Sequence, residues 1–258
     1  MEKSDLRDVT FIIPLRIDTV DRLENTLVIL DFLLGSFHTR IKILEACRRN
    51  TGILQQLLPG EVDYRFVEDR DDVFHRTKYI NTLTTTCETT YLSLWDTDVI
   101  IPSSQIEATM KRLREGKADF VTPFQDRFLD TSYILRDLYI QSGDIGLLEK
   151  QQGKMNALYT PNPVGGVFFA HRQAYVDTGM ENERFYGWGR EDGDRANRWK
   201  ILGYRHQHVP GPLFHLSHER GLNSSFHSSS QNDKKMAELQ RSLVMSKKEL
   251  KREIKSWR

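Results

Sequence analysis

The chain has 258 residues, a formal net charge of +1 and 38% hydrophobic residues, so it can fold as a globule with a large core. The balanced charge gives no field that attracts nucleic acid, and two cysteines cannot build a disulfide framework. No apolar run reaches the ~18 residues of a membrane span, and the polar N-terminus has no signal-peptide core. We therefore expect a cytoplasmic protein without a nucleic-acid partner.

Short apolar strands alternate with helices through the first half of the chain. The patterns predict strands at 9–15, 41–45, 64–67, 91–95 and 119–122, and helices at 19–34, 50–58, 76–89 and 104–116. Asp18 can cap the first helix, and Ser104 with Glu107 has the spacing of a capping box. The alternation predicts an α/β fold with a mostly parallel, twisted sheet flanked by helices.

Regular patterns become sparser in the second half. Residues 142–163 read as a loop, a strand is expected at 164–170, a helix to about 178, a helix at 191–202 and a strand at 204–209. The serine-rich stretch 224–230 is expected to be mobile. We place a single domain at 1–232 and a separate basic, amphipathic C-terminal helix at 233–258.

That C-terminal segment carries nine Lys/Arg and four Asp/Glu, and its apolar residues fall on one helical face. The stripe consists of Met236, Leu239, Leu243, Leu250, Ile254 and Trp257. Such a face packs on its own domain or on a second copy, whereas a basic amphipathic helix can also lie on an anionic membrane. Both remain open from the sequence, so peripheral contact with the inner membrane surface is the alternative to free solution.

Two aspartates follow the apolar run at 91–95. Asp96 and Asp98 stand two residues apart, so on an extended chain their carboxylates point the same way. The carboxyl ends of strands are where open α/β sheets bind ligands, and two hard oxygen donors suit Mg²⁺ or Mn²⁺ with a diphosphate. The alternative is that both aspartates only cap the next turn.

A tryptophan between two glycines, Gly187-Trp188-Gly189, precedes the acidic helix start at Glu191 and Asp192. Flexible glycines on both sides suit a ring that swings over a ligand. Helix-dipole stabilisation alone explains negative charge at a helix start, but not the aromatic residue before it. A flat ring beside carboxylates suits a sugar, and one acid can serve as a general base.

Histidines gather late in the chain, where five of the eight lie between positions 206 and 227. His215 and His218 follow a Pro-Gly-Pro turn, and imidazole suits Mn²⁺ or Zn²⁺. His206 and His208 share one face of the expected strand, where a histidine is more often structural than a ligand.

In chain order, the D-x-D at 96–98, the Gly-Gly-Val at 165–167, the G-W-G-x-E-D at 187–192 and the histidine at 218 resemble the β-1,4-galactosyltransferase-type glycosyltransferases. The D-x-D is common by itself, whereas the G-W-G-x-E-D is specific. The resemblance runs from about Phe11 to Asn223, most of the chain. It implies the GT-A nucleotide-sugar-binding fold, and a more distant similarity connects the later half to the polypeptide N-acetylgalactosaminyltransferases.

The resemblance also implies roles for individual residues. Its nucleotide and donor contacts correspond to Pro14, Arg16, Phe74, Arg76, Asp96 and Gly166. Its metal ligands correspond to Asp98, His218 and His215, the last standing where the family has methionine. Asp192 matches the general base, Glu191 the sugar-contacting acid and Trp188 the mobile tryptophan. Pro163 replaces an aromatic that crowds the donor sugar, and Gly193 replaces an aspartate that helps hold the acceptor.

These roles imply a metal-dependent, inverting transferase that uses Mn²⁺, with Mg²⁺ as the alternative. It would move a hexose, galactose or N-acetylgalactosamine, from a UDP-sugar to a hydroxyl of a saccharide or lipid-linked saccharide. Two other functions compete with this one. The first is a retaining enzyme of the N-acetylgalactosaminyltransferase type, which has D-x-H in place of D-x-D. The second is a nucleotide-sugar- or carbohydrate-binding module without turnover.

Overall fold

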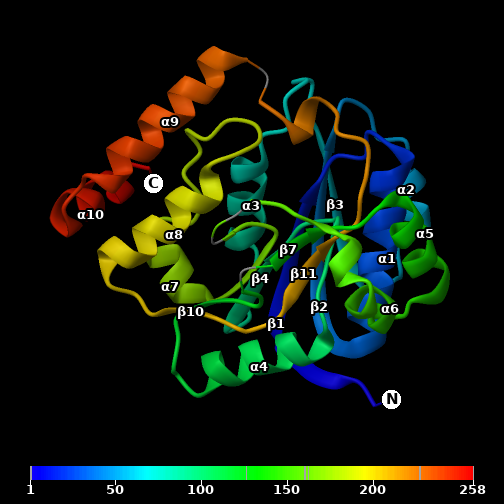
Figure 1. Ribbon diagram of the computed structural model, residues 1–258. Helices are drawn as coiled ribbons and strands as arrows, with labels where there is room; N and C mark the ends of the chain where they lie inside the picture. Colours follow the sequence, from blue (N-terminus) through cyan, green and yellow to red (C-terminus); the bar gives the residue numbers. More distant parts are fainter. Residues whose placement is uncertain (1, 126, 160, 162, 227, 258) are drawn as a thin grey trace.

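A twisted sheet runs through the centre of the molecule with helices packed on both faces (Figure 1). The computed structural model describes residues 2–125, 127–159, 161, 163–226 and 228–257, and within them seven strands form this sheet in the order β10-β6-β9-β4-β1-β2-β3. The strands are β1 Ser4–Leu15, β2 Phe37–Cys47, β3 Val62–Glu68, β4 Tyr91–Trp95, β6 Phe120–Thr122, β9 Val167–His171 and β10 His206–His208. Only β9 runs antiparallel to its described neighbours, β4 and β6, so the predicted mostly parallel α/β sheet is confirmed.

A second, smaller sheet was not predicted. In the described part of the chain its order is β5-β11-β7-β8, with β5 Val99–Ile100, β7 Arg127–Asp130, β8 Asn156–Ala157 and β11 Pro212–His215. Strands of two to four residues are too short to show a clear alternation of apolar and polar positions. These strands pair with segments far away in the sequence, since β7 and β11 lie side by side in parallel.

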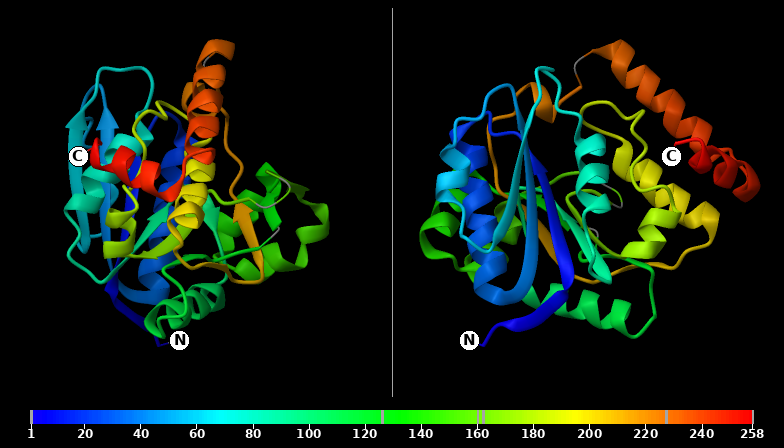
Figure 2. Two further views of the ribbon diagram at one scale, coloured as in Figure 1. Left: turned by 90° about the vertical axis from the view of Figure 1, so that its left-hand side faces the viewer. Right: turned by 180° about the vertical axis from the view of Figure 1, so that it is seen from behind.

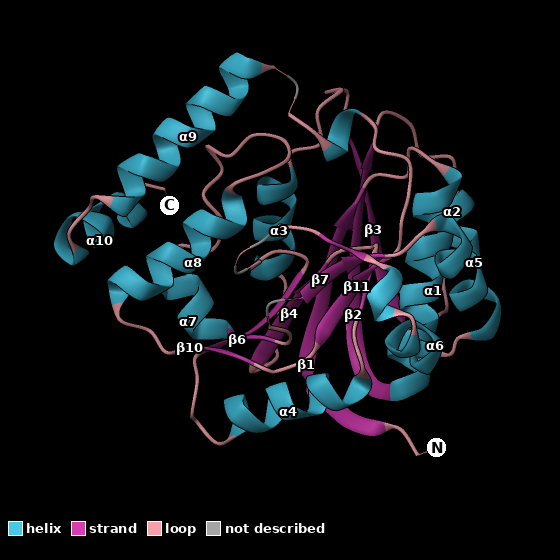
Figure 3. Cartoon of the chain, viewed as in Figure 1, coloured by secondary structure: helices cyan, strands magenta, loops and turns pink. Residues whose placement is uncertain are grey.

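The helices divide between the two faces of the large sheet. Those on one side are α1 Val20–Ser36, α2 Ile53–Leu57, α5 Tyr133–Ser142 and α6 Ile145–Lys150, with α4 Ser103–Arg114 across one end (Figure 3). The other side carries α3 Arg76–Thr85, α7 Arg172–Asp177, α8 Glu191–Leu202, α9 Ser229–Leu243 and α10 Lys247–Lys255. Each face has its own apolar core, one around Phe11 and Trp95 and the other around Phe168 and Trp199. Two short 3₁₀ turns complete the described secondary structure, Gln152–Lys154 and Leu222–Ser224.

Several predicted helix details are wrong. The region expected to be a loop at 142–163 contains α6 and β8. Glu107 does not close a capping box, because its carboxylate accepts a hydrogen bond from the Ser4 hydroxyl at 2.6 Å, and α4 starts without a side-chain cap. Thr19, rather than Asp18, caps α1 by accepting from the Arg22 amide at 3.2 Å.

The expected single C-terminal helix is two helices. A break before Ser246 separates α9 from α10, and Ser246 starts α10 with a capping box that it forms with Glu249. Leu250 and Ile254 are buried in a cluster with Leu202 of α8, so much of the apolar stripe packs on the protein's own domain. In both views of Figure 2, α9 and α10 (orange and red) lie on the side that carries α8 (yellow).

Among the described residues, no helix combines the length and apolar character needed to cross a membrane.

Candidate active site

The sheet edge at which β1 and β4 end opens into a cavity of about 340 Å³. Every site residue predicted from the sequence lines it: Pro14, Arg16, Phe74, Arg76, Asp96, Asp98, Gly166, Trp188, Glu191, Asp192, His215 and His218. These residues are spread over most of the chain, and the topology brings them together because parallel strands place their carboxyl ends at one edge. Their individual roles stay predictions.

One wall of the cavity carries the three predicted metal ligands. Asp98 Oδ2 lies 3.1 Å from His218 Nε2 and 3.7 Å from His215 Nε2, and candidate ligand atoms of all three residues lie within 4.8 Å of one another. Burial raises the pKa of Asp98, but the charges and hydrogen bonds of the two histidines outweigh it and hold that pKa well below its ordinary value. One carboxylate and two imidazoles converging on a point form a donor set that fits Mn²⁺ or Zn²⁺.

Asp130 supports this wall and was missed by the sequence analysis. It ends β7 opposite His215 in β11, and its Oδ1 lies 2.7 Å from His215 Nδ1. The Nδ1 edge of His215 is therefore occupied by a carboxylate, which leaves Nε2 to face Asp98, the arrangement that orients metal-binding histidines. Burial lowers the pKa of His215, but Asp98 and Asp130 raise it to about 9. His218 is oriented similarly, with Nδ1 lying 2.8 Å from the Glu219 carbonyl.

Asp96 has a different environment from Asp98. Arg76, at the start of α3, donates a hydrogen bond to Asp96 and lies 3.5 Å from the Glu191 carboxylate. Burial raises the pKa of Asp96 despite Arg76, and burial together with the Asp192 charge raises the pKa of Glu191 to about 7. The two aspartates of the D-x-D therefore have different partners: Asp96 pairs with Arg76, whereas Asp98 faces His215 and His218.

Arg16 is committed mainly to the protein itself. Its guanidinium donates to backbone carbonyls at 2.8 and 2.9 Å, pairs with Asp69 at 2.7 Å and lies 5.6 Å from the Phe74 ring centroid. Phe74 stacks on Tyr79, with centroids 5.3 Å apart, and its amide donates to the Asn223 side chain at 2.8 Å. Arg16 therefore lies against Phe74 at the cavity, and the nucleotide contact expected of Arg16 from the sequence stays a prediction.

The predicted base, Asp192, lies in the first turn of α8, and its carboxylate is placed between the backbone of Gly165 and the side chain of Arg195. A Cβ atom at Gly165 would lie 2.5 Å from Asp192 Oδ2, so the carboxylate rests against bare backbone there. Its Oδ1 accepts from Arg195, a fully buried residue that also donates to Glu181 at 2.8 Å. The carboxylate is therefore held on one oxygen by a fixed cation.

Gly193, the residue after Asp192, has no atom within 4 Å of the place where a Cβ atom would lie, so the cavity is open there.

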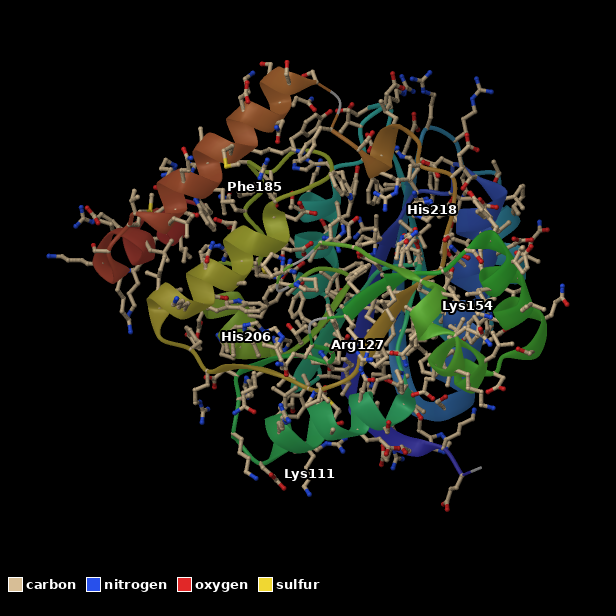
Figure 4. All side chains as sticks on the ribbon, viewed as in Figure 1. Lys111, Arg127, Lys154, Phe185, His206 and His218 are labelled. Carbon is tan, nitrogen blue, oxygen red and sulfur yellow. The ribbon has the colours of Figure 1, made fainter. Side chains whose placement is uncertain are left out.

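The loop before α8 places Trp188 at the cavity. Gly187, Gly189 and Arg190 all have left-handed backbone, with φ of 76°, 102° and 74°, a conformation that glycine adopts at little cost. The Trp188 ring meets the Phe226 ring edge-on, with centroids 5.1 Å apart and an interplanar angle of 71°. Figure 4 shows Phe185, just before this loop, between α8 and α9, and His218 beside the central strands.

Comparisons with known proteins agree with this geometry. A family model described as the N-terminal domain of galactosyltransferase matches residues 155–219, which include Asp192 and His218. The catalytic domain of Drosophila beta1,4-galactosyltransferase 7, solved with xylobiose, has 14% identity and a TM-score of 0.53, with 90% of this chain and 79% of that chain covered. Glucosyl-3-phosphoglycerate synthase from Mycobacterium tuberculosis, solved with Mn²⁺, UDP and phosphoglyceric acid, has 13% identity and a TM-score of 0.56, covering 93% and 80%. No curated protein sequence matches the chain.

The chain is a glycosyltransferase with the GT-A fold, and it is related to galactosyltransferases. The structural likeness establishes the fold, and the family model connects the site-bearing stretch to galactosyltransferases. Both the resemblance noted in the sequence and the prediction of an enzyme are thereby confirmed.

Sequence reasoning missed three supporting residues of this glycosyltransferase. Asp130 ends a short apolar run, Phe128-Leu129-Asp130, whose partner strand could not be identified from local pattern. Arg195 follows Asp192 at the i+3 spacing of a helical ion pair, a signal that was present but indistinguishable from a surface pair. Lys235 was counted as part of a basic tail, whereas its side chain reaches the Trp188 loop.

Proposed function

We propose that this glycosyltransferase is metal dependent and inverting, and that it moves a hexose from a UDP-sugar to a hydroxyl of a saccharide or lipid-linked saccharide. The observation that carries the proposal is the shared cavity: the Asp98, His215 and His218 donor set and the Asp192 carboxylate line the same space. A structural neighbour solved with Mn²⁺ and UDP, and another solved with xylobiose, support the donor and acceptor classes.

The metal side would bind the donor's diphosphate. Asp98 Oδ2 and the Nε2 atoms of His215 and His218 would hold the cation, with Asp130 and the Glu219 carbonyl fixing the imidazole orientations. When bound, a divalent cation would neutralise negative charge on the departing diphosphate. Phe74 would border the base, at the part of the cavity where its ring is held by Arg16 and Tyr79.

The opposite side would bind the acceptor and move the proton. Asp192 would accept the proton of the attacking hydroxyl, while Arg195 holds the Oδ1 atom and so fixes the direction of the carboxylate. Glu191, whose pKa is raised to about 7, would exchange hydrogen bonds with sugar hydroxyls near neutral pH in either protonation state. Trp188 would cover the sugar and exclude water from the reacting carbon.

Galactose is the donor sugar that the matching family model supports, since it describes a galactosyltransferase, and N-acetylgalactosamine is the other donor that the resemblance implies. The cavity is lined by Pro163 and is open at Gly193, two positions where the resemblance implies larger side chains. We therefore propose that the cavity of this enzyme accepts a bulkier donor or acceptor group than the cavity of the β-1,4-galactosyltransferases does.

A UDP-release assay with Mn²⁺, a panel of UDP-sugars and mixed saccharide acceptors tests the activity. Release that needs both an acceptor and the metal is the expected result, and proton NMR of the product should show inverted anomeric configuration. Retained configuration would favour the N-acetylgalactosaminyltransferase-type alternative. Binding of UDP-sugars without any release would favour the module without turnover.

We also propose a cytoplasmic location with peripheral membrane contact. The support is the basic face of α10, whose exposed side chains are Lys247, Lys248, Lys251, Arg252 and Lys255. Co-sedimentation with vesicles containing an anionic phospholipid should fall when Lys247, Lys248 and Lys251 are replaced by glutamine. Equal sedimentation of variant and parent would remove the basis of the proposal.

A further inference from the structure

A lysine of the C-terminal region is buried against the active-site loop. Lys235, in the middle of α9, is 3% exposed, and its Nζ donates to the Trp188 carbonyl at 2.5 Å. Lysine is almost never fully buried unless it is paired, because an ammonium group that leaves water needs compensating partners. Burial lowers the pKa of Lys235, and the nearby Glu191 charge opposes that shift. A lysine whose buried ammonium donates to a backbone carbonyl of the cavity loop does not serve to keep the protein soluble, which points to a role at the site.

The same contact region includes an aromatic ring shared by the loop and the helix. Phe226 lies 5.1 Å from the Trp188 ring, 5.4 Å from the Arg190 guanidinium and 5.6 Å from the Lys235 ammonium. A Cβ atom at Gly189 would lie 3.0 Å from the Phe226 ring, so the glycine backbone packs directly on it. The Trp188 loop is therefore covered by Phe226 on one side and tied to α9 through Lys235.

A second bond from α9 holds the loop where its backbone is least favourable. Arg190 adopts φ of 74°, a left-handed conformation uncommon for a residue with a side chain. Its guanidinium donates to the Asn232 side-chain oxygen at 2.8 and 3.1 Å. Asn232 and Lys235 stand three residues apart on α9, so one helical face provides both attachments.

We propose that Lys235 is a positioning residue of the active site, which fixes the Trp188 loop from the C-terminal helix and so sets the place of the indole over the cavity. The role of the indole in transfer rests on the proposed function, whereas the attachment of the loop to α9 does not. The C-terminal segment, which the sequence analysis set apart as a separate basic helix, thereby becomes part of the site.

Lys235→Met tests the proposal, since methionine keeps much of the volume and loses the ammonium group. Lys234→Met is the matched control, because Lys234 is the preceding residue of α9 and is exposed. With Lys235→Met, acrylamide quenching of tryptophan fluorescence should rise as Trp188 is freed, and the rise should vanish when Trp188→Phe is added. Turnover should fall by about 10-fold while UDP affinity changes by less than about twofold, because the loop acts on the sugar and not on the nucleotide.

The quenching measurement separates this proposal from the proposed function. If the parent enzyme shows no transfer at all, the proposed function fails, and the quenching difference between Lys235→Met and Lys234→Met still decides the placement of Trp188. Equal quenching in both variants would overturn the positioning role. If Lys235→Met does not fold, Lys235→Gln, which has a shorter and uncharged side chain, takes its place, and Trp188 quenching equal to that of Lys234→Gln would overturn the positioning role.

Discussion

The two sides of the cavity are held in place by different means. The side with the predicted metal ligands is positioned by strand pairing, since Asp98 follows β4 and the register of β7 with β11 places Asp130 opposite His215. The side that carries Trp188 is a glycine-bounded loop, which contacts side chains of α9 and the Phe226 ring. Backbone ladders in a sheet core open only at high free energy, whereas a loop held by a few side chains opens locally. The donor's charged end would therefore meet a fixed surface, and its sugar a surface that can release it.

The largest effect is expected opposite the metal ligands, from Asp192→Asn. The amide cannot take the proton of the acceptor hydroxyl, so the transfer rate should fall between about 10²- and 10⁴-fold. UDP affinity, measured by calorimetry with Mn²⁺, should stay unchanged because the metal side is intact. Transfer at the parent rate would remove Asp192 from the role of base.

On the fixed side, Asp98→Ala should abolish the gain in UDP affinity that Mn²⁺ provides. The expected loss exceeds about 100-fold, because losing an outer-shell partner of a metal ligand already costs up to about that much. Asp31→Ala, at an exposed position of α1, is the control. A UDP affinity that is identical with and without Mn²⁺ in the parent enzyme would show that the metal site is wrong.

Asp130→Ala tests whether the fixed side depends on the second sheet. Without Asp130, His215 loses the carboxylate at Nδ1 that orients its ring, so Mn²⁺ affinity should fall by about 10- to 100-fold. UDP binding without metal should not change. An unchanged Mn²⁺ affinity would mean that strand pairing alone orients His215.

The smallest effect concerns Glu191 and pH. Its pKa is raised to about 7 from 4.5, so between these values the folded protein binds more protons than the unfolded chain. Stability should therefore fall as pH rises through that window, by an amount on the order of 2 kcal/mol. Glu191→Gln should lose this slope, which melting temperatures at pH 5 and pH 7.5 would measure. Parallel curves for both proteins would contradict the raised pKa.

Local patterns sufficed for the fixed strand and for the acidic helix start. The run Tyr91–Trp95 is a buried strand as predicted, and α8 covers the predicted 191–202. In both cases the pattern that predicts the element, an apolar run or an acidic helix start, lies within a few consecutive residues. The motifs identified from those runs meet in one cavity because parallel strands end at a common edge.

What the sequence did not reveal depends on contacts between distant segments. Asp130 acquires its place only from the pairing of β7 with β11, 85 residues away in the chain. The role of Lys235 depends on the docking of α9 on α8, and composition alone assigns a lysine in a basic tail to solvent. The strands of the second sheet are too short for periodicity to mark them.

Arg76 carries a consequence for how this enzyme can change over evolution. It lies between Asp96 and Glu191, so one cation balances the carboxylates of two cavity residues that come from distant parts of the chain. Replacing it alone would leave the buried Glu191 and the half-buried Asp96 without their shared cation, which is far more damaging than replacing a balanced set. We expect homologous chains to keep all three residues or to exchange them together, so the specificity of this site would drift through coordinated rather than single substitutions.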